Sequence, residues 1–229
     1  MVVLAIETSS RAGSVALWRD GQLLGERLLA QSFNHGSLLH EELRRLTSEA
    51  GVAPAAIGLI AVSQGPGSYT GLRIGLATAR TAAYVLGKPL LGVPSLDVLA
   101  ENASVDAPHV ATLLDAKRGE VYACLYWRRG GRLDRQTPYH LARPEALELP
   151  VPCVVLGDAI ERYGPVLDRG GVTLAPREAW RPQAGVLARL AAERYNAGER
   201  QELHSVGLIY LRRPEAEDVW ERKHGVAGR

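Results

Sequence analysis

A glycine-rich segment of this sequence could bind an anion. It reads SQGPGSYTGLRIG from Ser63 to Gly75, and it lies between an apolar run, residues 57–62, and an Ala-rich helical pattern, residues 72–86. Glycine tolerates positive φ and close backbone approach, and Ser68 or Thr70 can cap the helix that follows. We expect a strand–loop–helix elbow with backbone N–H groups at a helix N-terminus. An anion or a partner protein can bind at such a place.

The elbow does not fit two familiar phosphate-binding motifs. No Gly-Lys-Ser/Thr follows the glycines, so it is not a Walker A loop. The glycines at 65, 67 and 71 leave three residues in the second gap, so it is not Gly-x-Gly-x-x-Gly either. A tight turn that binds no ligand is an equal alternative at this stage.

Nucleophilic and metal-binding side chains give no site from spacing alone. Five serines lie in or near polar turns, but none has a Gly-x-Ser-x-Gly segment around it: Ser9, Ser10, Ser14, Ser63 and Ser68. His35 and His40 are five positions apart and therefore off one helical face, and the other four histidines are scattered. We predict no catalytic residue and no metal site.

The composition is that of an ordinary soluble globular protein. The 229 residues are 46% hydrophobic and 23% charged, and the net charge of +2 from 27 basic and 25 acidic residues is too balanced for a dedicated nucleic-acid binder. No apolar run approaches eighteen residues, so we expect no membrane span and a cytoplasmic location. Cys124 and Cys153 lie in apolar contexts, which predicts two buried free thiols.

The first half predicts a three-stranded meander followed by helices and strands. Apolar runs at 2–6, 14–18 and 22–30 predict strands, with a hairpin at Asp20-Gly21. The first run ends at Glu7-Thr8-Ser9-Ser10, a carboxylate followed by three hydroxyls. Further along the chain, the pattern predicts helices over 36–50, 71–86 and 96–102, and strands over 59–63 and 90–93.

The second half repeats this pattern loosely. An apolar strand at 109–114 ends at the acidic turn Asp115 to Glu120, a strand at 121–128 follows, and Gly130-Gly131 turns it back. We also expect strands at 151–156, 172–174 and 206–211, and helices at 158–167 and 182–197. We therefore divide the chain into an N-terminal lobe, 1–104, and a C-terminal lobe, 105–229. Its charged tail either is mobile or packs back on the first lobe.

Two helical stripes suggest a partner surface. Leucines recur along the first helix, small residues recur at Gly75, Ala79 and Ala83 of the second, and Arg73 and Arg80 share a face. Packing on the sheet is the alternative use of these stripes. The predicted partner interface consists of Leu39, Leu43, Leu46, Tyr69, Leu72, Arg73, Gly75, Leu76, Ala79, Arg80 and Ala83.

Four collinear segments resemble one family. They are LAIETSS from Leu4, SVAL from Ser14, GPGSYTGLRIG from Gly65 and DAKRGEVY from Asp115. Together they resemble the TsaB family, also called YeaZ, and the elbow segment is the most specific of them. The resemblance implies an α/β, two-lobed actin/hexokinase-like fold (ASKHA, RNase H-like), with a degenerate nucleotide site and a small C-terminal lobe.

The resemblance also implies where a nucleotide or anion would bind. Active members of this fold hold nucleotide-bound Mg²⁺ with an aspartate at the end of the first strand, a place that Glu7 takes here. The implied nucleotide- or anion-binding residues are Glu7, Thr8, Ser9, Ser10, Gly67, Ser68 and Asp115. No cofactor is required by the resemblance, which leaves open ATP or ADP with Mg²⁺ at an interface of a complex.

The implied function is that of a non-catalytic scaffold. Such a chain dimerises with itself when alone and with the catalytic TsaD-type subunit when that is present, and a TsaE-type ATPase docks on the pair. The complex forms N6-threonylcarbamoyladenosine at position 37 of tRNAs that read ANN codons, and tRNA contact comes mostly from the assembly. The alternative is an independent enzyme, either an ATPase or kinase that uses Glu7 and Asp115, or a peptidase that uses a serine.

Overall fold

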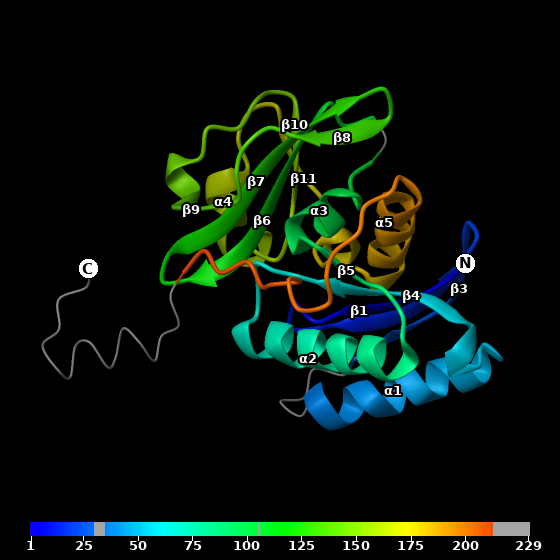
Figure 1. Cartoon of the computed structure of the whole chain (residues 1–229). Helices are drawn as coiled ribbons and strands as arrows, with labels where there is room; N and C mark the ends of the chain where they lie inside the picture. The colour runs from blue at the N-terminus through cyan, green and yellow to red at the C-terminus, as the bar shows by residue number, and fades with distance from the viewer. Residues whose placement is uncertain (30–34, 105, 213–229) are drawn as a thin grey trace, which may run out of the picture.

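The fold is built around two mixed β-sheets. The computed structural model describes residues 1–29, 35–104 and 106–212. The first sheet has the strand order β3-β2-β1-β4-β5, with β1 antiparallel to β2 and parallel to β4 (Figure 1). Its strands are β1 (Val2–Glu7), β2 (Ser14–Arg19), β3 (Gln22–Leu28), β4 (Ile57–Ser63) and β5 (Leu90–Val93).

The second sheet repeats the plan of the first. Its strand order is β11-β10-β6-β7-β8, again an antiparallel meander followed by two parallel strands, and the short β9 (His140–Ala142) pairs with β7. The predicted internal repeat is confirmed at the level of topology. The other strands are β6 (His109–Lys117), β7 (Glu120–Arg129), β8 (Arg132–Arg135), β10 (Cys153–Leu156) and β11 (Val172–Leu174).

Helices cover both faces of the first sheet, which explains why β1 is apolar throughout. Side chains alternate between the faces of a strand. Val2, Leu4 and Ile6 of β1 therefore pack toward α1 (His35–Glu49) and α2 (Tyr69–Leu86), whereas Val3 and Ala5 pack toward α5 (Ala184–Asn196). The backbone N–H of Ala184 donates to Ser14 Oγ and to Glu26 Oε1, both at 2.9 Å, and these bonds fix the start of α5 on the hairpin β2–β3.

The second lobe is the smaller one. Its sheet is covered by α4 (Ile160–Leu167) on one face and α3 (Ser95–Ala100) on the other, helices of 8 and 6 residues against 15, 18 and 13 in α1, α2 and α5. Within the described ranges there are also three 3₁₀ turns: Pro54–Ala56, Pro144–Ala146 and Arg177–Ala179. Cys124 and Cys153 are both free and buried, as predicted.

The chain returns to the first lobe after residue 183. Helix α5 and the segment 199–212, which we call the strap, pack on the first sheet and on α2, although the predicted division assigned them to the second lobe. The strap is not a strand at 206–211, in contrast to the prediction, because its backbone joins neither sheet. Residue 105 and the tail 213–229 lie outside the described residues. None of the described helices is long and apolar enough to cross a membrane.

Candidate functional site

The glycine-rich elbow packs tightly against the first polar turn. A Cβ at Gly67 would come closer than 3.0 Å to the Ser9 carbonyl, and one at Gly75 would overlap the Thr8 hydroxyl. The N–H of Ser68 donates to the Ser9 carbonyl at 2.7 Å, and Ser68 Oγ accepts from the N–H of Gly71 at 3.2 Å, so Ser68 caps α2 as predicted. The glycines therefore provide close approach between two protein segments.

Glu7 is sealed inside this contact. Its side chain is fully buried, and its Oε1 accepts from the N–H and the hydroxyl of Ser9 at 2.6 and 2.5 Å. Burial raises the pKa of Glu7 to about 7, although the hydrogen bonds from Ser9 and Ser63 lower it. Glu7 Oε2 and Thr8 Oγ1 are buried without a hydrogen-bond partner. Near neutral pH this carboxyl is therefore protonated in a large fraction of molecules.

These residues do not fit a nucleotide-bound Mg²⁺. Oxygen ligands of Mg²⁺ must be charged or polar, and they must face the ion within an octahedral shell that keeps several waters. Glu7 faces Ser9 instead, and Thr8 and Ser9 are buried with it. The buried arrangement of Glu7, Thr8 and Ser9 is not that of an open metal–nucleotide site, and their implied role in binding a nucleotide stays a prediction. The glycines bring the elbow onto the turn and leave no room above Glu7.

A cavity does lie beside this turn, between the two lobes. Its volume is about 810 Å³, and of the predicted nucleotide- or anion-binding residues only Ser10 lines it. Three arginines and four carboxylates face it, so its charges nearly balance. Its lining consists of Ser10, Arg11, Ala12, Glu26, Leu28, Asp158, Glu161, Arg177, Glu178, Trp180, Arg181 and Gln183.

Asp115 occupies the equivalent turn of the second sheet. Burial raises the pKa of this carboxyl, but the hydrogen bonds from Lys117 and the charges of Lys117 and Arg162 lower it in sum. Asp115 Oδ1 accepts from the N–H of Lys117 at 2.8 Å, and Oδ2 forms an ion pair with Lys117 Nζ. The N–H of Asp115 donates to Asp158 Oδ1 at 2.8 Å, and burial raises the pKa of Asp158. Asp158 was missed from the sequence because it precedes an ordinary short helix.

The serines that could act as nucleophiles all have structural hydrogen bonds. Ser9 Oγ donates to Glu7, Ser10 Oγ donates to the carbonyl of Ala12, and Ser63 Oγ accepts from the N–H of Thr8. Ser14 and Ser68 accept from the backbone N–H groups that begin α5 and α2. A serine nucleophile needs a base that removes its proton. In these contacts only Ser9 bonds to a potential base, the Glu7 carboxyl, and both side chains are buried.

Most of the predicted partner residues belong to the core. Helices α1 and α2 turn their leucine and small-residue stripes toward the first sheet, so the predicted interface is corrected at seven positions. These buried residues are Leu39, Leu46, Leu72, Gly75, Leu76, Ala79 and Ala83. Leu43 is half-buried against the same core. The stripes therefore hold the helices on the sheet.

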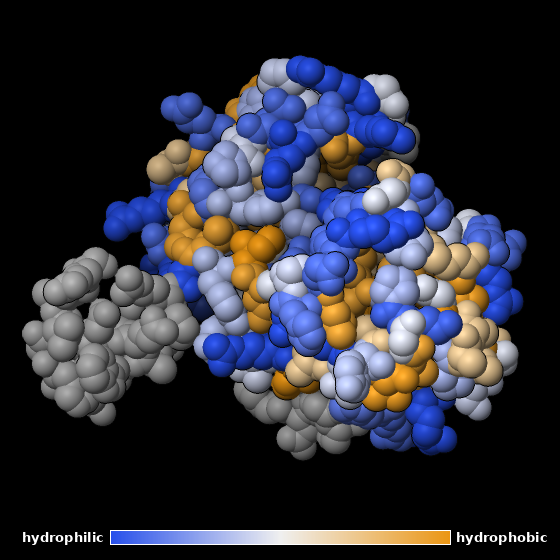
Figure 2. All heavy atoms as spheres, in the orientation of Figure 1, coloured by the Kyte–Doolittle hydropathy of each residue, from blue (hydrophilic) through white to orange (hydrophobic). Residues whose placement is uncertain are grey.

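The opposite face of α2 is exposed and largely apolar. Tyr84 and Val85 are 77% and 73% exposed, more than the other exposed large hydrophobic side chains of the described residues. Ala77 and Thr81 lie two turns and one turn before them, respectively, and are also exposed. Figure 2 shows hydrophobic side chains at the surface over the C-terminal part of α2. The outward face of α2 thus has small side chains in the middle of the helix and large apolar side chains at its C-terminal end.

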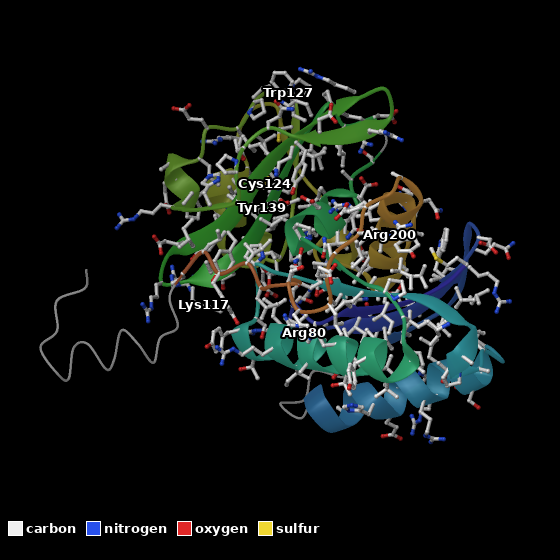
Figure 3. All side chains as sticks on the ribbon, viewed as in Figure 1. Arg80, Lys117, Cys124, Trp127, Tyr139 and Arg200 are labelled. Carbon is white, nitrogen blue, oxygen red and sulfur yellow. The ribbon has the colours of Figure 1, made fainter. Side chains whose placement is uncertain are left out.

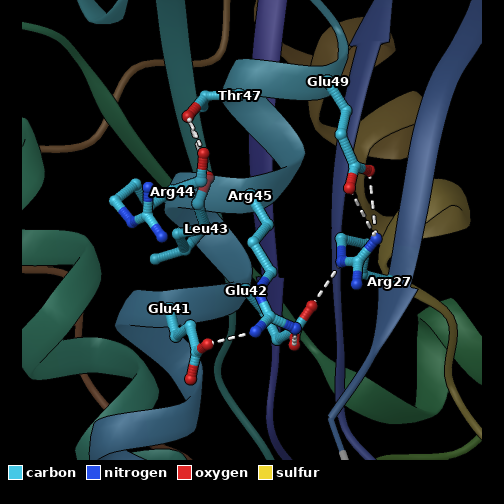
Figure 4. A network of polar contacts seen from close by, with 8 residues as sticks. All are labelled: Arg27, Glu41, Glu42, Leu43, Arg44, Arg45, Thr47 and Glu49. Carbon is cyan, nitrogen blue, oxygen red and sulfur yellow. Dashed lines mark hydrogen bonds and ion pairs between the residues drawn. The ribbon is translucent and has the colours of Figure 1, made fainter.

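The outward face of α1 is charged. Arg27 of β3 forms ion pairs with Glu42 and, at 3.0 Å, with Glu49, and Arg45 pairs with Glu41 one turn away (Figure 4). Thr47 Oγ1 donates to the Leu43 carbonyl at 2.9 Å. The ion pairs of Arg27 fasten α1 to β3, and the other two contacts lie within α1 itself.

The strap engages the remaining predicted partner residues. Arg80 donates to the carbonyl of Val206 at 2.5 Å, and Arg73 Nε donates to the hydroxyl of Tyr210 at 3.2 Å. Tyr69 contacts both Arg73 and Tyr210: the Arg73 guanidinium lies 4.0 Å from its ring centre, and the tilted Tyr210 ring lies at 5.4 Å. Figure 3 shows Arg80 between α2 and the strap. These side chains thus bind their own chain.

The strap also links the elbow to the second lobe. Gln64 Nε2 donates to the carbonyl of Gly207 at 3.0 Å, and the N–H of Ile209 donates to the Gln64 carbonyl at 2.8 Å. At its end, Arg212 bonds to the Ala116 carbonyl and pairs with Glu120 of the turn β6–β7. The elbow and the second acidic turn are thus connected through one extended segment.

A second inter-lobe contact was not visible in the sequence. Asp97 of α3 accepts from the hydroxyls of Tyr126 and Tyr139 at 2.9 and 2.6 Å and from Arg194 of α5 at 2.8 Å. The tyrosines come from the second lobe, and Arg194 comes from the helix that covers the first sheet. Their spacing along the chain gives no signal that they meet.

Comparisons with known proteins show which family the chain resembles in sequence and in fold. The family described as "TsaD: tRNA N6-adenosine threonylcarbamoyltransferase" matches residues 24–168. The protein named tRNA threonylcarbamoyladenosine biosynthesis protein TsaB from Bacillus subtilis is 31% identical, over 96% of this chain and 98% of its own length. The protein of the same name from Escherichia coli is 28% identical over 98% of this chain and 99% of its own length.

The structure of YeaZ from Pseudomonas aeruginosa superposes with a TM-score of 0.81 at 30% identity, covering 92% of this chain and 99% of that one. This chain belongs to the TsaB (YeaZ) family. Its architecture is the two-lobed actin/hexokinase-like fold of the ASKHA type, as the sequence resemblance implied. TsaB-like sequence thus extends through α5 and the strap, beyond the segments that carried the resemblance.

Proposed function

We propose that this TsaB-family chain is the non-catalytic scaffold of a tRNA-modifying complex. It pairs with a catalytic TsaD-type subunit, and the complex forms N6-threonylcarbamoyladenosine at position 37 of tRNAs that read ANN codons. The proposal is supported by near full-length relatives that carry the name of this pathway. The enclosed Glu7 also favours a chain that is not an independent ATPase or kinase.

The observation that carries the pairing is the exposed face of α2. Tyr84 and Val85 would cost free energy in water that a partner helix recovers by covering them. Ala77 and Thr81 lie earlier on the same face and allow a helix backbone to approach closely. The charged outer side of α1 would form the polar rim of such an interface.

The other partners follow from this arrangement. Alone, the chain forms a homodimer through the same face of α2, and the catalytic subunit replaces the second copy. A TsaE-type ATPase docks on the pair, and most tRNA contacts come from the assembly. The chain itself requires no cofactor. ATP or ADP with Mg²⁺ is held at an interface of the complex, because Glu7 is not placed to hold the metal.

Coelution with the TsaD-type subunit tests the proposal. The wild-type chain should coelute with that subunit on size exclusion and support tRNA modification in the full set of proteins. Ala77→Arg should abolish coelution while the chain stays folded, because it puts a charge into the apolar face; Ala77→Ser is the matched control. Coelution of Ala77→Arg at wild-type strength would contradict the interface. ATP turnover by the isolated chain that Glu7→Ala abolishes would contradict the scaffold role.

A further inference from the structure

The two lobes carry equivalent hairpins that differ in charge. In the first sheet, β2 and β3 flank the turn Asp20-Gly21, and Arg19 pairs with Gln22 across it. In the second sheet, β7 and β8 flank the turn Gly130-Gly131, and Arg129 pairs with Arg132. The four turn residues all have positive φ, so the two turns have a similar backbone geometry. The first hairpin is neutral at its tip and the second is doubly basic.

The Arg129–Arg132 pair is unfavourable for folding. Like charges directly opposite each other in an antiparallel pair repel. Among the described residues no carboxylate forms an ion pair with either guanidinium, and both side chains are exposed. The Arg129 guanidinium lies 4.8 Å from the ring centre of Trp127, which is 37% exposed. That ring holds one of the two charges in place.

The charge is local to this hairpin. Residues 127–135 contain four arginines and one acid, Asp134, a net charge of +3 that exceeds the +2 of the whole chain. The acid lies across from Trp127, away from the tip. A general preference of the chain for arginine does not explain the excess positive charge of the β7–β8 hairpin. The tip of the β2–β3 hairpin has Asp20 beside Arg19 and is therefore neutral. Figure 2 shows hydrophilic side chains over the β7–β8 hairpin at the top of the molecule.

The neighbouring arginines are already neutralised. Arg189 of α5 pairs with Glu101 at 2.7 Å and with Glu193 at 2.8 Å, and Arg194 pairs with Asp97. They line the hollow of about 480 Å³ between α5 and the hairpin, together with Arg132. The hairpin arginines, in contrast, form no ion pair among the described residues: Arg128 bonds to the carbonyls of Ala107 and Ser104, Arg135 lies on the Tyr139 ring, and Arg129 and Arg132 flank the tip.

We propose that the tip of the β7–β8 hairpin is an RNA contact, in which Arg129 and Arg132 bind backbone phosphates. A phosphate between two opposed guanidiniums converts their repulsion into two charge-assisted hydrogen-bonded contacts. The ring of Trp127 holds the Arg129 guanidinium in place on the exposed surface of the hairpin. The inference rests on the proposed function, since the tRNA bound by the complex supplies the phosphates. It assigns to this chain one direct contact with that tRNA.

The test measures tRNA binding by the assembled complex over a series of salt concentrations. The double variant Arg129→Gln, Arg132→Gln should weaken binding by about tenfold or more at 0.1 M salt, and it should lower the slope of log affinity against log salt by about 1.5. Arg132→Gln alone gives the β7–β8 hairpin the same Arg–Gln pair that Arg19 and Gln22 form in the β2–β3 hairpin. This single variant should lower the slope by about half as much. Arg19→Gln is the matched control and should leave both quantities unchanged.

Two further readouts separate this effect from misfolding. Removing the opposed charges should leave the thermal midpoint unchanged or raise it, and coelution with the catalytic subunit should persist. Wild-type affinity and slope in the double variant would overturn the inference, while the proposed function stands if the complex assembles and modifies tRNA. If the wild-type chain does not assemble, the proposed function fails, and the same variants of the isolated chain are titrated with tRNA to decide the inference.

Other anionic partners are distinguished in the same experiment. Vesicles of phosphatidylglycerol and phosphatidylcholine and an acidic polyglutamate peptide are titrated beside the tRNA. Loss of binding to vesicles or peptide in the double variant, with tRNA binding unchanged, would assign the tip to a membrane or a protein and overturn the RNA contact. Loss confined to tRNA supports it.

Discussion

Gly75 of α2 lies directly against the hydroxyl of Thr8 at the end of β1. A Cβ at position 75 would overlap Thr8 Oγ1, and the neighbouring contacts of Gly67 and Gly71 with the backbone of Ser9 and Thr8 are equally close. Three glycines of one segment therefore press the elbow onto the first polar turn. The enclosed state of Glu7 follows from this contact, because the turn has no freedom to open while α2 stays in place.

Gly75→Ala should destabilise the fold. The methyl gains up to about 1 kcal/mol of helix propensity but overpacks a buried contact, which typically costs about 1–3 kcal/mol. Thr8→Ala removes the obstructing hydroxyl, which has no hydrogen-bond partner, so the double variant should recover most of the loss. Urea unfolding of the two single variants and the double variant measures this coupling. A Gly75→Ala chain at least as stable as wild type would contradict the contact.

The free energy of unfolding should fall between about pH 4.5 and 7 because of Glu7. Its pKa is about 7 in the folded chain, whereas the ordinary pKa of a glutamate carboxyl is 4.5, so the unfolded chain loses this proton first as pH rises. Between these two pH values the unfolded state binds fewer protons than the native state, so the free energy of unfolding falls as pH rises. The total loss is about 3 kcal/mol; it is complete above pH 7, and there is no loss below pH 4.5.

Glu7→Gln should remove this component of the pH dependence. The amide oxygen can still accept from Ser9, and no proton is exchanged in this range. Urea unfolding at pH 5 and pH 8 measures the difference between the two conditions. Glu161→Gln, a change at an exposed carboxylate, serves as control and should keep the wild-type difference. An unchanged difference in Glu7→Gln would show that another group titrates.

Ala79→Trp and Ala77→Trp should have opposite effects although they differ by half a turn. Ala79 is fully buried against the first sheet, so a tryptophan there should unfold the chain or cost several kcal/mol. Ala77 is exposed, so a tryptophan there should leave the monomer folded and block pairing through α2. Circular dichroism and size exclusion measure the two effects separately. A folded, paired Ala77→Trp chain would rule out this face as the interface.

The repeated meander could be predicted from the sequence, because alternating apolar runs and glycine turns depend on neighbours along the chain. The sequence could not predict whether the small-residue stripe of α2 packs on the sheet or faces a partner. Gly75, Ala79 and Ala83 are as small as Ala77 and Thr81, and periodicity gives the spacing of a face without naming its partner. Gly67 is predicted at an anion site and Gly75 at a partner interface for the same reason, since the close neighbour of both is a segment about sixty residues away.

Contacts between the lobes were the least predictable part. Asp97, Tyr139 and Arg194 come from three elements that only the return of α5 to the first sheet brings together. Residues 206–211 of the strap were predicted as a strand from their apolar side chains, but side-chain and backbone contacts with Gln64, Arg80 and Arg73 hold the strap instead. Such contacts depend on where each element lies in space.

Asp97→Asn should release the junction between the lobes and lower the pKa of Tyr139. Burial raises that pKa strongly, and the negative charge of Asp97 together with the hydrogen bond to its carboxylate raises it further. An amide removes the charge but keeps an oxygen for the tyrosine hydroxyls, and it leaves Arg194 without its ion-pair partner. Because breaking a buried pair by removing one charge costs about 3–5 kcal/mol and Arg194 is partly exposed, we expect a loss of roughly 1–3 kcal/mol.

Two measurements distinguish this charge effect from a general loss of packing. The ultraviolet absorbance of tyrosinate in an alkaline titration should show one tyrosine shifted to lower pH in Asp97→Asn. Tyr139→Phe should lack that titrating group and should cost about 1 kcal/mol, because one hydroxyl is lost and the charge pair remains. If Asp97→Asn unfolds at the wild-type urea concentration and its tyrosines titrate as in wild type, Asp97 does not hold the two lobes together.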